Sequence, residues 1–202
     1  MKYIISHADS KVPESLIRFS SDNHQSYASY HGYSHIFDRT DTQYDDRDSR
    51  WRKIELVLSL LEDSSTEWIL WMDYDAFFVN TKGKTVELAM SDIPGNPSVC
   101  FSSSPAGENV PYINSGVFFV RNTEFSRNFF KKVWERGVIK EYMYDEKLYG
   151  FSCPGGDQNT LIHTLFVEFK ECIGSEIYIA DSAMFNARPS IGDTYITTKD
   201  YS

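Results

Sequence analysis

The sequence lacks the marks of membrane-bound and secreted proteins. No hydrophobic run approaches the roughly 20 apolar residues of a membrane-spanning helix, and residues 1–6 are too short and too polar for a signal peptide. The 3 cysteines, Cys100, Cys153 and Cys172, are odd in number and lack zinc-site spacing, which indicates reduced thiols. We therefore expect an intracellular, cytoplasmic protein with no membrane span.

Basic residues are also scarce. Lys and Arg number 20 against 29 Asp and Glu, which gives a net charge of −9. Because a phosphate backbone must be neutralised by basic side chains, this balance argues against a nucleic-acid partner. It also means that an anionic substrate should arrive together with a cation.

Glycine-rich phosphate loops are missing as well. The chain contains neither Gly-x-Gly-x-x-Gly nor a Walker glycine loop, which disfavours a dinucleotide or ATP-type phosphate cradle. Residues 7–11, which follow the first expected strand, have no glycine or arginine. A sugar-phosphate nucleotidyltransferase, which resembles its relatives in a glycine- and arginine-rich loop at this point, is therefore the weaker of two enzyme alternatives.

The composition and the order of apolar and amphipathic segments predict one α/β domain over residues 1–202. The 202 residues and the 41% hydrophobic content suffice for one sizeable core. Short apolar runs alternate with amphipathic segments, which is typical of a mostly parallel sheet flanked by helices. The residues from 38 to 49 are polar and predict a mobile loop. Strands are expected at 3–6, 33–37, 68–72, 98–101, 117–121, 177–179 and 195–197, and helices from Pro13, at 23–31, 50–62, 85–90 and 123–136, and from Asp157.

The strongest chemical signal is a pair of carboxylates that follows a buried strand. Residues 68–72, Trp-Ile-Leu-Trp-Met, lead into Asp73, Tyr74 and Asp75, and an apolar run resumes directly afterwards. Side chains alternate along a strand, so Asp73 and Asp75 should point the same way and Tyr74 away. The alternative is a solvated turn, but such a turn is rarely flanked by apolar residues on both sides. A divalent cation is the simplest way to keep both carboxylates ionised there.

Other polar residues fall at expected loop positions. Ser6 ends the first expected strand and His7 begins the loop after it, where α/β proteins often bind a base or ribose. Lys53 lies in the first turn of the expected helix 50–62, where basic residues make sense either beside an anion or as a merely solvated basic face. Gly116, in a polar turn expected at residues 114–116, would let a ligand approach closely. Asp157 could serve simply as a helix N-cap.

These residues resemble a known family in five ordered segments. The segments are Tyr27-Ala28 with His31-Gly32-Tyr33, Trp51-x-Lys53-Ile54, the Asp73-Tyr74-Asp75 segment, Asn114-Ser115-Gly116-Val117-Phe118 and Asp157-Gln158-Asn159. Together they resemble the retaining galactosyltransferase–xylosyltransferase family of fungi and plants, which has the GT-A fold. That fold is α/β and Rossmann-like, with a mixed, mostly parallel central sheet flanked by helices.

The resemblance implies a function and a set of site residues. It implies transfer from a nucleotide-diphosphate sugar, usually UDP-linked, to a glycan or glycoprotein acceptor, with retention at the anomeric carbon. Mn²⁺ or Mg²⁺ would bind Asp73 and Asp75, and Lys53 would lie near the diphosphate. The donor sugar would be lined by Asn114, Ser115, Asp157 and Gln158. We expect Asp75 and Asp157 to be the catalytic carboxylates, with Asp157 orienting or stabilising the sugar.

Two departures from the family pattern bear on this expectation. The family's C-terminal Gly-Asp-x-x-x-His supplies a third metal ligand, but Thr197 stands at that place here and no histidine follows His163. A sugar-nucleotide-binding domain without catalysis therefore stays open as an alternative. The family's Golgi anchor is also missing, which would suit a bacterial enzyme or one of a large algal virus that glycosylates its coat protein in the host cytoplasm.

Overall fold

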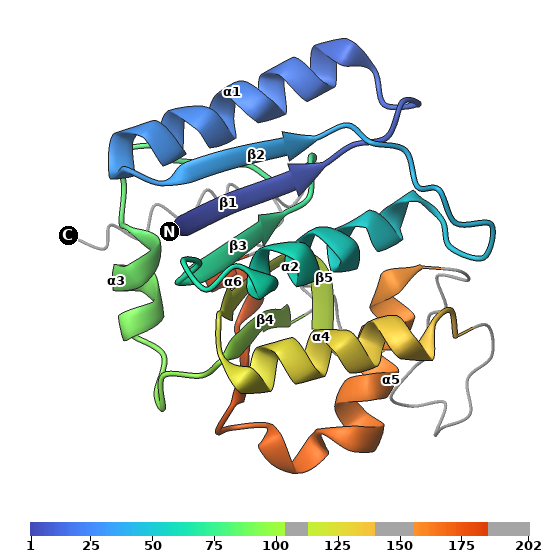
Figure 1. Cartoon of the computed structure of the whole chain (residues 1–202). Coiled ribbons are helices and arrows are strands. Elements are labelled where there is room, and N and C mark those ends of the chain that lie inside the picture. Colours follow the sequence, from blue (N-terminus) through green and yellow to red (C-terminus); the bar gives the residue numbers. More distant parts are fainter. Residues whose placement is uncertain (104–112, 140–155, 186–202) are drawn as a thin grey trace, which may run out of the picture.

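A computed structural model describes residues 1–103, 113–139 and 156–185 (Figure 1). The described part contains a 6-stranded sheet with the strand order β2-β1-β3-β5-β4-β6. The strands are β1 (Lys2–His7), β2 (Ser34–Asp38), β3 (Trp68–Met72), β4 (Val99–Ser103), β5 (Ile113–Arg121) and β6 (Ile177–Ala180). Only β5 runs against the other described strands, because it pairs antiparallel with both β3 and β4. The sheet is thus mixed and mostly parallel, as the sequence predicted.

The predicted helices are present, with one correction, and the short helix at Ser182–Phe185 falls where the sequence predicted a loop. They are α1 (Glu14–His31), α2 (Arg52–Glu62), α3 (Val86–Ser91), α4 (Glu124–Arg136), α5 (Asp157–Glu168) and the short α6 (Ser182–Phe185). The prediction of two helices between Pro13 and His31 was wrong, because α1 is continuous. No Gly or Pro interrupts residues 14–31, and Ser20 and His24 fit into the buried face of the helix. The strand expected at 195–197 lies outside the described residues.

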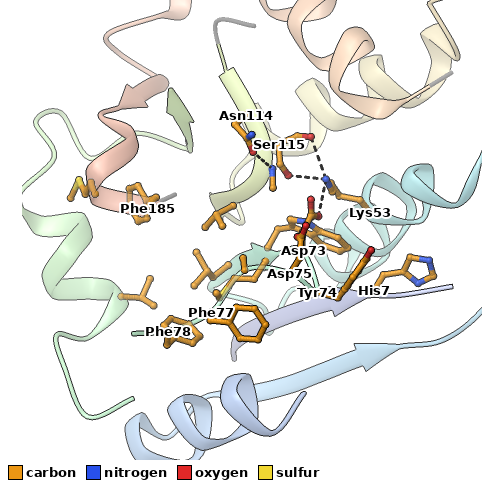
Figure 2. A pocket seen from close by; sticks show the side chains of 18 of the residues that line it. His7, Lys53, Asp73, Tyr74, Asp75, Phe77, Phe78, Asn114, Ser115 and Phe185 are labelled. Atoms are coloured by element: carbon orange, nitrogen blue, oxygen red, sulfur yellow. Dashed lines mark hydrogen bonds and ion pairs between the residues drawn. The ribbon is translucent and has the colours of Figure 1, made fainter. Parts of the chain in front are cut away.

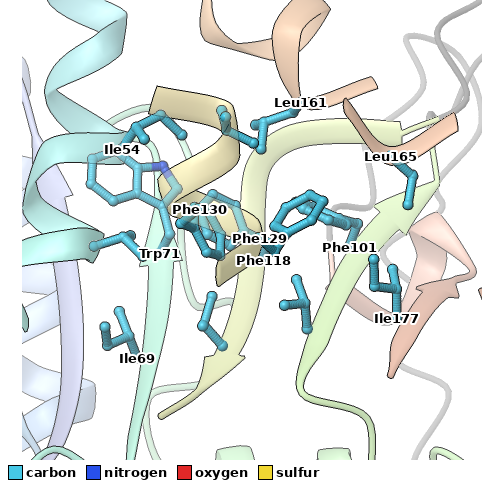
Figure 3. Packing of buried hydrophobic residues seen from close by; sticks show 14 of the residues in the cluster. Ile54, Ile69, Trp71, Phe101, Phe118, Phe129, Phe130, Leu161, Leu165 and Ile177 are labelled. Carbon is cyan, nitrogen blue, oxygen red and sulfur yellow. The ribbon is translucent and has the colours of Figure 1, made fainter. Parts of the chain in front are cut away.

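Helices cover both faces of the sheet, which explains why the central strands are apolar throughout. Alternate side chains of β3 enter two separate cores. Ile69 and Trp71 pack with α2, α4 and α5 on one face, where Phe118 and Phe130 lie at the centre (Figure 3). Leu70 and Met72 pack with α1 and α3 on the other face. The side-chain alternation therefore places Trp71 on the same side of the sheet as α2.

The start of β5 differs from its prediction in a way that shapes the site. Residues 114–116 were expected to form a turn, but they belong to the strand. The pairing with β4 jumps from Phe101–Phe118 to Ser102–Asn114, so residues 115–117 form a bulge. Because β5 is antiparallel, this bulge lies beside the carboxyl end of β3, and the amide of Asp73 donates to the carbonyl of Gly116 (2.7 Å). Bulges often redirect side chains next to functional sites.

The described helices give no candidate for a bilayer crossing. None of those within residues 1–103, 113–139 and 156–185 is both long and apolar enough to span a membrane.

Candidate active site

A large cleft opens at the carboxyl ends of β1 and β3 and at the start of β5 (Figure 2). Its volume is about 1890 Å³, well above the roughly 300–1,000 Å³ of a typical small-molecule pocket. The cleft collects almost every residue that the sequence singled out. His7, Lys53, Asp73, Tyr74, Asp75, Asn114, Ser115, Gly116, Asp157 and Gln158 all line it.

Ser6 is the exception among the predicted site residues. Its side chain is fully buried and lies 2.8 Å from Nδ1 of His24, so it does not line the cleft. Successive residues of a strand face opposite sides, which is why His7 reaches the cleft and Ser6 does not. Ser6 therefore belongs to the packing beneath the site.

The centre of the site is the ammonium group of Lys53. Its Nζ donates to the carbonyl oxygen of Ser115 (2.8 Å) and lies 3.1 Å from Oδ1 of Asp73 and 3.3 Å from Oδ2 of Asp157. It also lies 5.2 Å from the ring centre of Trp71. The side chain of Lys53 is only 4% exposed, and that of Asp157 3%. One buried cation therefore joins α2, β3, β5 and α5.

Burial and neighbouring charges have opposite effects on the pKa values of Lys53 and Asp157. Burial alone would lower the pKa of Lys53, but the carboxylates of Asp157 and Asp73 outweigh it and raise the pKa, so the amine stays charged. Burial raises the pKa of Asp157 by favouring its neutral form, Lys53 opposes that effect, and the nearby charge of Asp73 adds to it. Lys53 is therefore charged in this cluster, because one carbonyl and two carboxyl groups surround its ammonium group.

Trp71 holds Asp73 from the strand side. Its indole Nε1 donates to Oδ1 of Asp73 (2.7 Å), the oxygen that also faces Lys53. Sequence reasoning did not include Trp71 in the site, although a signal existed. Residues two apart on a strand share one side, so the tryptophan preceding the carboxylate pair was a candidate partner for it.

The carboxylate pair itself lies in a turn. The amide of Ala76 donates to the carbonyl oxygen of Asp73 (2.9 Å), so the strand ends at Met72 and residues 73–76 turn. The expectation that Tyr74 points away was therefore wrong, since strand alternation stops before it and Asp73, Tyr74 and Asp75 all line the cleft. Asp75 is exposed and free to meet a ligand.

The pair fits a divalent cation by its chemistry. Both residues offer carboxylate oxygens, the ligands that Mn²⁺ and Mg²⁺ accept, and such ions commonly keep waters and substrate phosphates as further ligands. Among the described residues, no three His, Cys, Asp or Glu side chains gather as a metal site. The third-ligand position of the resemblance, Thr197, lies outside the described residues.

The bulge of β5 is tied to the start of α5. Oε1 of Gln158 accepts from the amide of Ser115 (3.0 Å), and the Oδ1 of Asn114 accepts from the amide of Gly116 (2.7 Å). Asp157 is the first residue of α5, with Gly156 as its N-cap, and no side-chain cap bond forms. The N-cap alternative for Asp157 is therefore wrong, and its carboxylate faces Lys53 instead.

The loop after the carboxylate pair is anchored by α1. His24 Nε2 lies 2.7 Å from the carbonyl oxygen of Ala76, and the side-chain amide of Asn23 bonds both the amide (2.8 Å) and the carbonyl (3.0 Å) of Phe78. The ring of Tyr27 stacks on Phe78 at 3.7 Å. Sequence reasoning missed Asn23 and His24, since no local pattern links residues more than 50 positions apart.

Comparison with known proteins finds similarity to glycosyltransferases. The family model of the galactosyl transferase GMA12/MNN10 family matches residues 3–93. A curated relative, Glycosyltransferase 6 of Arabidopsis thaliana, is 25% identical over 174 residues, which cover 78% of this chain and 38% of the relative. The chain thus spans well under half the length of that relative.

Solved structures extend the likeness to most of the chain. A glycosyltransferase involved in the glycosylation of the major capsid of PBCV-1 has a TM-score of 0.62 at 19% identity, covering 90% of this chain and 82% of that one. The apo-form glycosyltransferase GlyE of Streptococcus pneumoniae TIGR4 has a TM-score of 0.53 at 11% identity, covering 90% and 45%. At these identities the likeness establishes the fold. The chain therefore has the α/β fold of these glycosyltransferases and is similar to the galactosyl transferase GMA12/MNN10 family over residues 3–93.

Proposed function

We propose that this chain transfers a sugar from a nucleotide-diphosphate donor, with UDP as the favoured nucleotide, to a glycan or glycoprotein acceptor. The observation that carries the proposal is the cluster of Lys53, Asp73 and Asp157 beside the exposed Asp75. Positive charge and metal-ligating carboxylates meet there at the carboxyl end of the sheet, where open α/β sheets bind their ligands.

The chemistry needs stabilisation of the leaving group. A diphosphate gains negative charge as the glycosidic bond breaks, and Mn²⁺ or Mg²⁺ bound by Asp73 and Asp75 would act on it as a Lewis acid. Lys53 contributes by holding Asp73 in place and by keeping a positive charge near the diphosphate. One charge pair at about 4 Å is worth roughly 4 kcal/mol at an effective dielectric of about 20, before desolvation costs.

Asp157 has the role of orienting the donor sugar. Its carboxylate lines the cleft but is buried and paired with Lys53, which makes it a poor nucleophile. We therefore propose retention through attack by the acceptor on the same face, with Asp157 stabilising the positive charge that develops on the sugar. NMR of the first-formed product tests this, since an inverted anomeric carbon would contradict it.

The size of the cleft supports the proposal of a glycan or glycoprotein acceptor. About 1890 Å³ leaves room for an acceptor beside a nucleotide-sugar. The structurally similar viral enzyme is involved in the glycosylation of the major capsid of PBCV-1. A coat glycoprotein is accordingly an acceptor to test alongside free oligosaccharides.

Calorimetric titration with a panel of nucleotide-sugars, with and without Mn²⁺, tests the donor site. We expect metal-dependent binding and release of free nucleotide diphosphate on turnover, both lost in Asp75→Asn. Asp22→Asn is the matched control, because Asp22 is exposed on α1 and does not line the cleft. Binding without any turnover would favour a sugar-nucleotide-binding domain, and pyrophosphate release from a nucleoside triphosphate and a sugar phosphate would favour a nucleotidyltransferase.

A further inference from the structure

A second, smaller cavity lies beside the start of β3, where α3 packs against the sheet (Figure 1). Its volume is about 210 Å³, below the roughly 300–1,000 Å³ of a pocket for a drug-sized ligand. Among the described residues, only Ile93 lines both this cavity and the cleft. The residues that line it from the sheet are Trp68, Phe119 and Arg121, and those from α3 and the following loop include Glu87, Met90 and Asn96. The cavity has room for a small ligand.

The pairing of β3 with β5 brings Trp68 and Arg121 together in this cavity. The two residues are directly opposite each other in the antiparallel register, where the β-carbons of such residues lie about 4.5–5.5 Å apart. Trp68 and Phe119 belong to the core that packs against α1 and α3. Because residues two apart on a strand share one side, Arg121 lies on the same face as Phe119, and its guanidinium is 5.2 Å from the centre of that ring.

The guanidinium of Arg121 has no anionic partner. Within the part of the chain that the structure describes, this half-buried side chain forms no salt bridge and no hydrogen bond. Burial lowers the pKa of Arg121, and no neighbouring acid opposes that effect. The indole Nε1 of Trp68 opposite it is also buried without a partner among the described residues. Two neighbouring residues thus have N–H donors without an acceptor, which is rare for buried polar groups.

The acidic residue at this cavity already has partners of its own. Glu87 lies 2.7 Å from Nζ of Lys2 and accepts a hydrogen bond from the hydroxyl of Tyr33. Its charge is therefore balanced, whereas the charge of Arg121 is not. The chain as a whole has a net charge of −9, which repels anions, so an anion at this place must be held by local groups.

We propose that this cavity binds a small oxyanion, in the form of a carboxylate or phosphate group, through the guanidinium of Arg121. A guanidinium offers a planar fork of N–H donors that matches two oxygens of either group. Such a ligand would supply the negative charge that Arg121 lacks and a hydrogen-bond acceptor beside Trp68. The inference is independent of the proposed sugar transfer, because neither Trp68 nor Arg121 lines the cleft.

The indole N–H of Trp68 offers a local probe of this cavity. The chain has 4 tryptophans, so a ¹H–¹⁵N NMR spectrum contains few indole signals. The signal of Trp68 is identified by nuclear Overhauser contacts with the ring of Tyr33, whose centre lies 4.9 Å from that of the indole. Sodium phosphate and sodium acetate are titrated separately, with sodium chloride at equal ionic strength as the reference. We expect a saturable shift of this signal with at least one oxyanion, with a dissociation constant of about 10 mM or tighter, and no comparable shift with chloride.

Variants connect the binding to the guanidinium. Arg121→Gln keeps a side chain of similar polarity but removes the charge and the fork, and it should weaken binding at least about tenfold. Arg121→Lys keeps the charge alone and should weaken binding to a smaller extent. Arg18→Gln is the matched control, because Arg18 is exposed on α1 and does not line the cavity. It should keep the dissociation constant of the wild type.

The outcomes are distinct for the ligand and for the site. Tighter binding of phosphate than of acetate supports the site and identifies a phosphate group as its ligand, and the reverse order identifies a carboxylate. A shift that chloride reproduces, or a failure of both oxyanions to saturate, overturns the inference. An unchanged dissociation constant in Arg121→Gln overturns it as well. The titrations of the wild type decide the matter even if Arg121→Gln does not fold, and none of these results bears on nucleotide binding in the cleft.

Discussion

The indole of Trp71 donates a hydrogen bond of 2.7 Å to Oδ1 of Asp73, two residues further along the chain. The same oxygen faces Lys53 at 3.1 Å, so two donors from different elements fix one carboxylate. Residues that orient metal-binding carboxylates commonly affect metal affinity about 10–100-fold when replaced. Trp71 thereby links the core of the sheet to the proposed metal site.

Trp71→Phe should weaken Mn²⁺ binding about tenfold, because it removes the N–H donor while an aromatic ring still fills the core. Titration of Mn²⁺ in the presence of UDP measures this. Trp68→Phe is the control, since Trp68 lies on the same strand but its Nε1 has no partner among the described residues. An equal loss in both variants would attribute the effect to packing rather than to the bond with Asp73.

Lys53→Met should destabilise the fold by about 3–5 kcal/mol, because it leaves the buried carboxylate of Asp157 without its cation. Urea unfolding followed by fluorescence measures the free energy of unfolding. Adding Asp157→Asn should recover part of the loss, since the unpaired charge is then removed as well. Lys131→Met, at an exposed pair on α4, should change stability by less than about 0.5 kcal/mol. Strictly additive losses for Lys53 and Asp157 would contradict the coupling.

The parts of the site that lie next to each other in sequence could be predicted, and those that meet through the fold could not. The run of residues 68–75 contains its own signal, because a doubly buried strand that ends in two carboxylates is unusual. The bulge at residues 115–117 depends on how β5 pairs with two neighbouring strands, which no local pattern encodes. A polar stretch such as Asn114-Ser115-Gly116 looks like a turn unless that pairing is known.

The same limit applies to buried polar side chains. His24 lies on a helix with a mixed surface, and only the fold brings its ring to Ser6 and to the carbonyl of Ala76. Asp38 and Arg52 look like solvated charges in the sequence, but they meet His7 where the ends of β1, β2 and α2 converge. Long-range hydrogen bonds of this kind depend on tertiary packing, whereas hydrophobic periodicity is local.

Acid should destabilise the protein through its buried histidines. Burial lowers the pKa of His24, and burial together with the nearby His24 lowers the pKa of His35 to about 4. The unfolded chain therefore binds more protons than the folded one below pH 6.5, so the free energy of unfolding should fall as the pH drops from 6.5 towards 4. For His35 alone, a shift of this size corresponds to about 3 kcal/mol, which its partial exposure reduces to about 1–2 kcal/mol.

Urea unfolding between pH 7 and 4.5 measures this dependence. His35→Gln removes the titrating ring and should flatten the curve relative to the wild type over that range. Carboxylates that titrate in the same range affect both proteins equally, so the difference between the two curves isolates the histidine. Parallel curves would show that His35 contributes nothing.

Arg47 holds a segment that the sequence predicted to be a mobile loop. Its guanidinium lies 4.2 Å from the ring centre of Trp134, 5.2 Å from that of Trp51 and 5.6 Å from that of Tyr44. It also donates to the carbonyl oxygen of Trp134 (2.9 Å). Residues 39–48 form a loop, as the sequence predicted, and a planar cation among three aromatic rings attaches this loop to α4 at Arg47.

Arg47→Lys should lower the free energy of unfolding by about 1 kcal/mol and make this segment more accessible to proteolysis, although the charge is kept. The reason is that an ammonium group cannot stack on the rings or reach the carbonyl with the same geometry. Limited proteolysis, with cleavage sites identified by mass spectrometry, reports the local effect, and urea unfolding reports the global one. Arg39→Lys is the control, because Arg39 lies in the same segment and its only salt bridge among the described residues is with the exposed Glu14. If both variants were cleaved equally in residues 39–48, the aromatic contacts of Arg47 would not be what orders the segment.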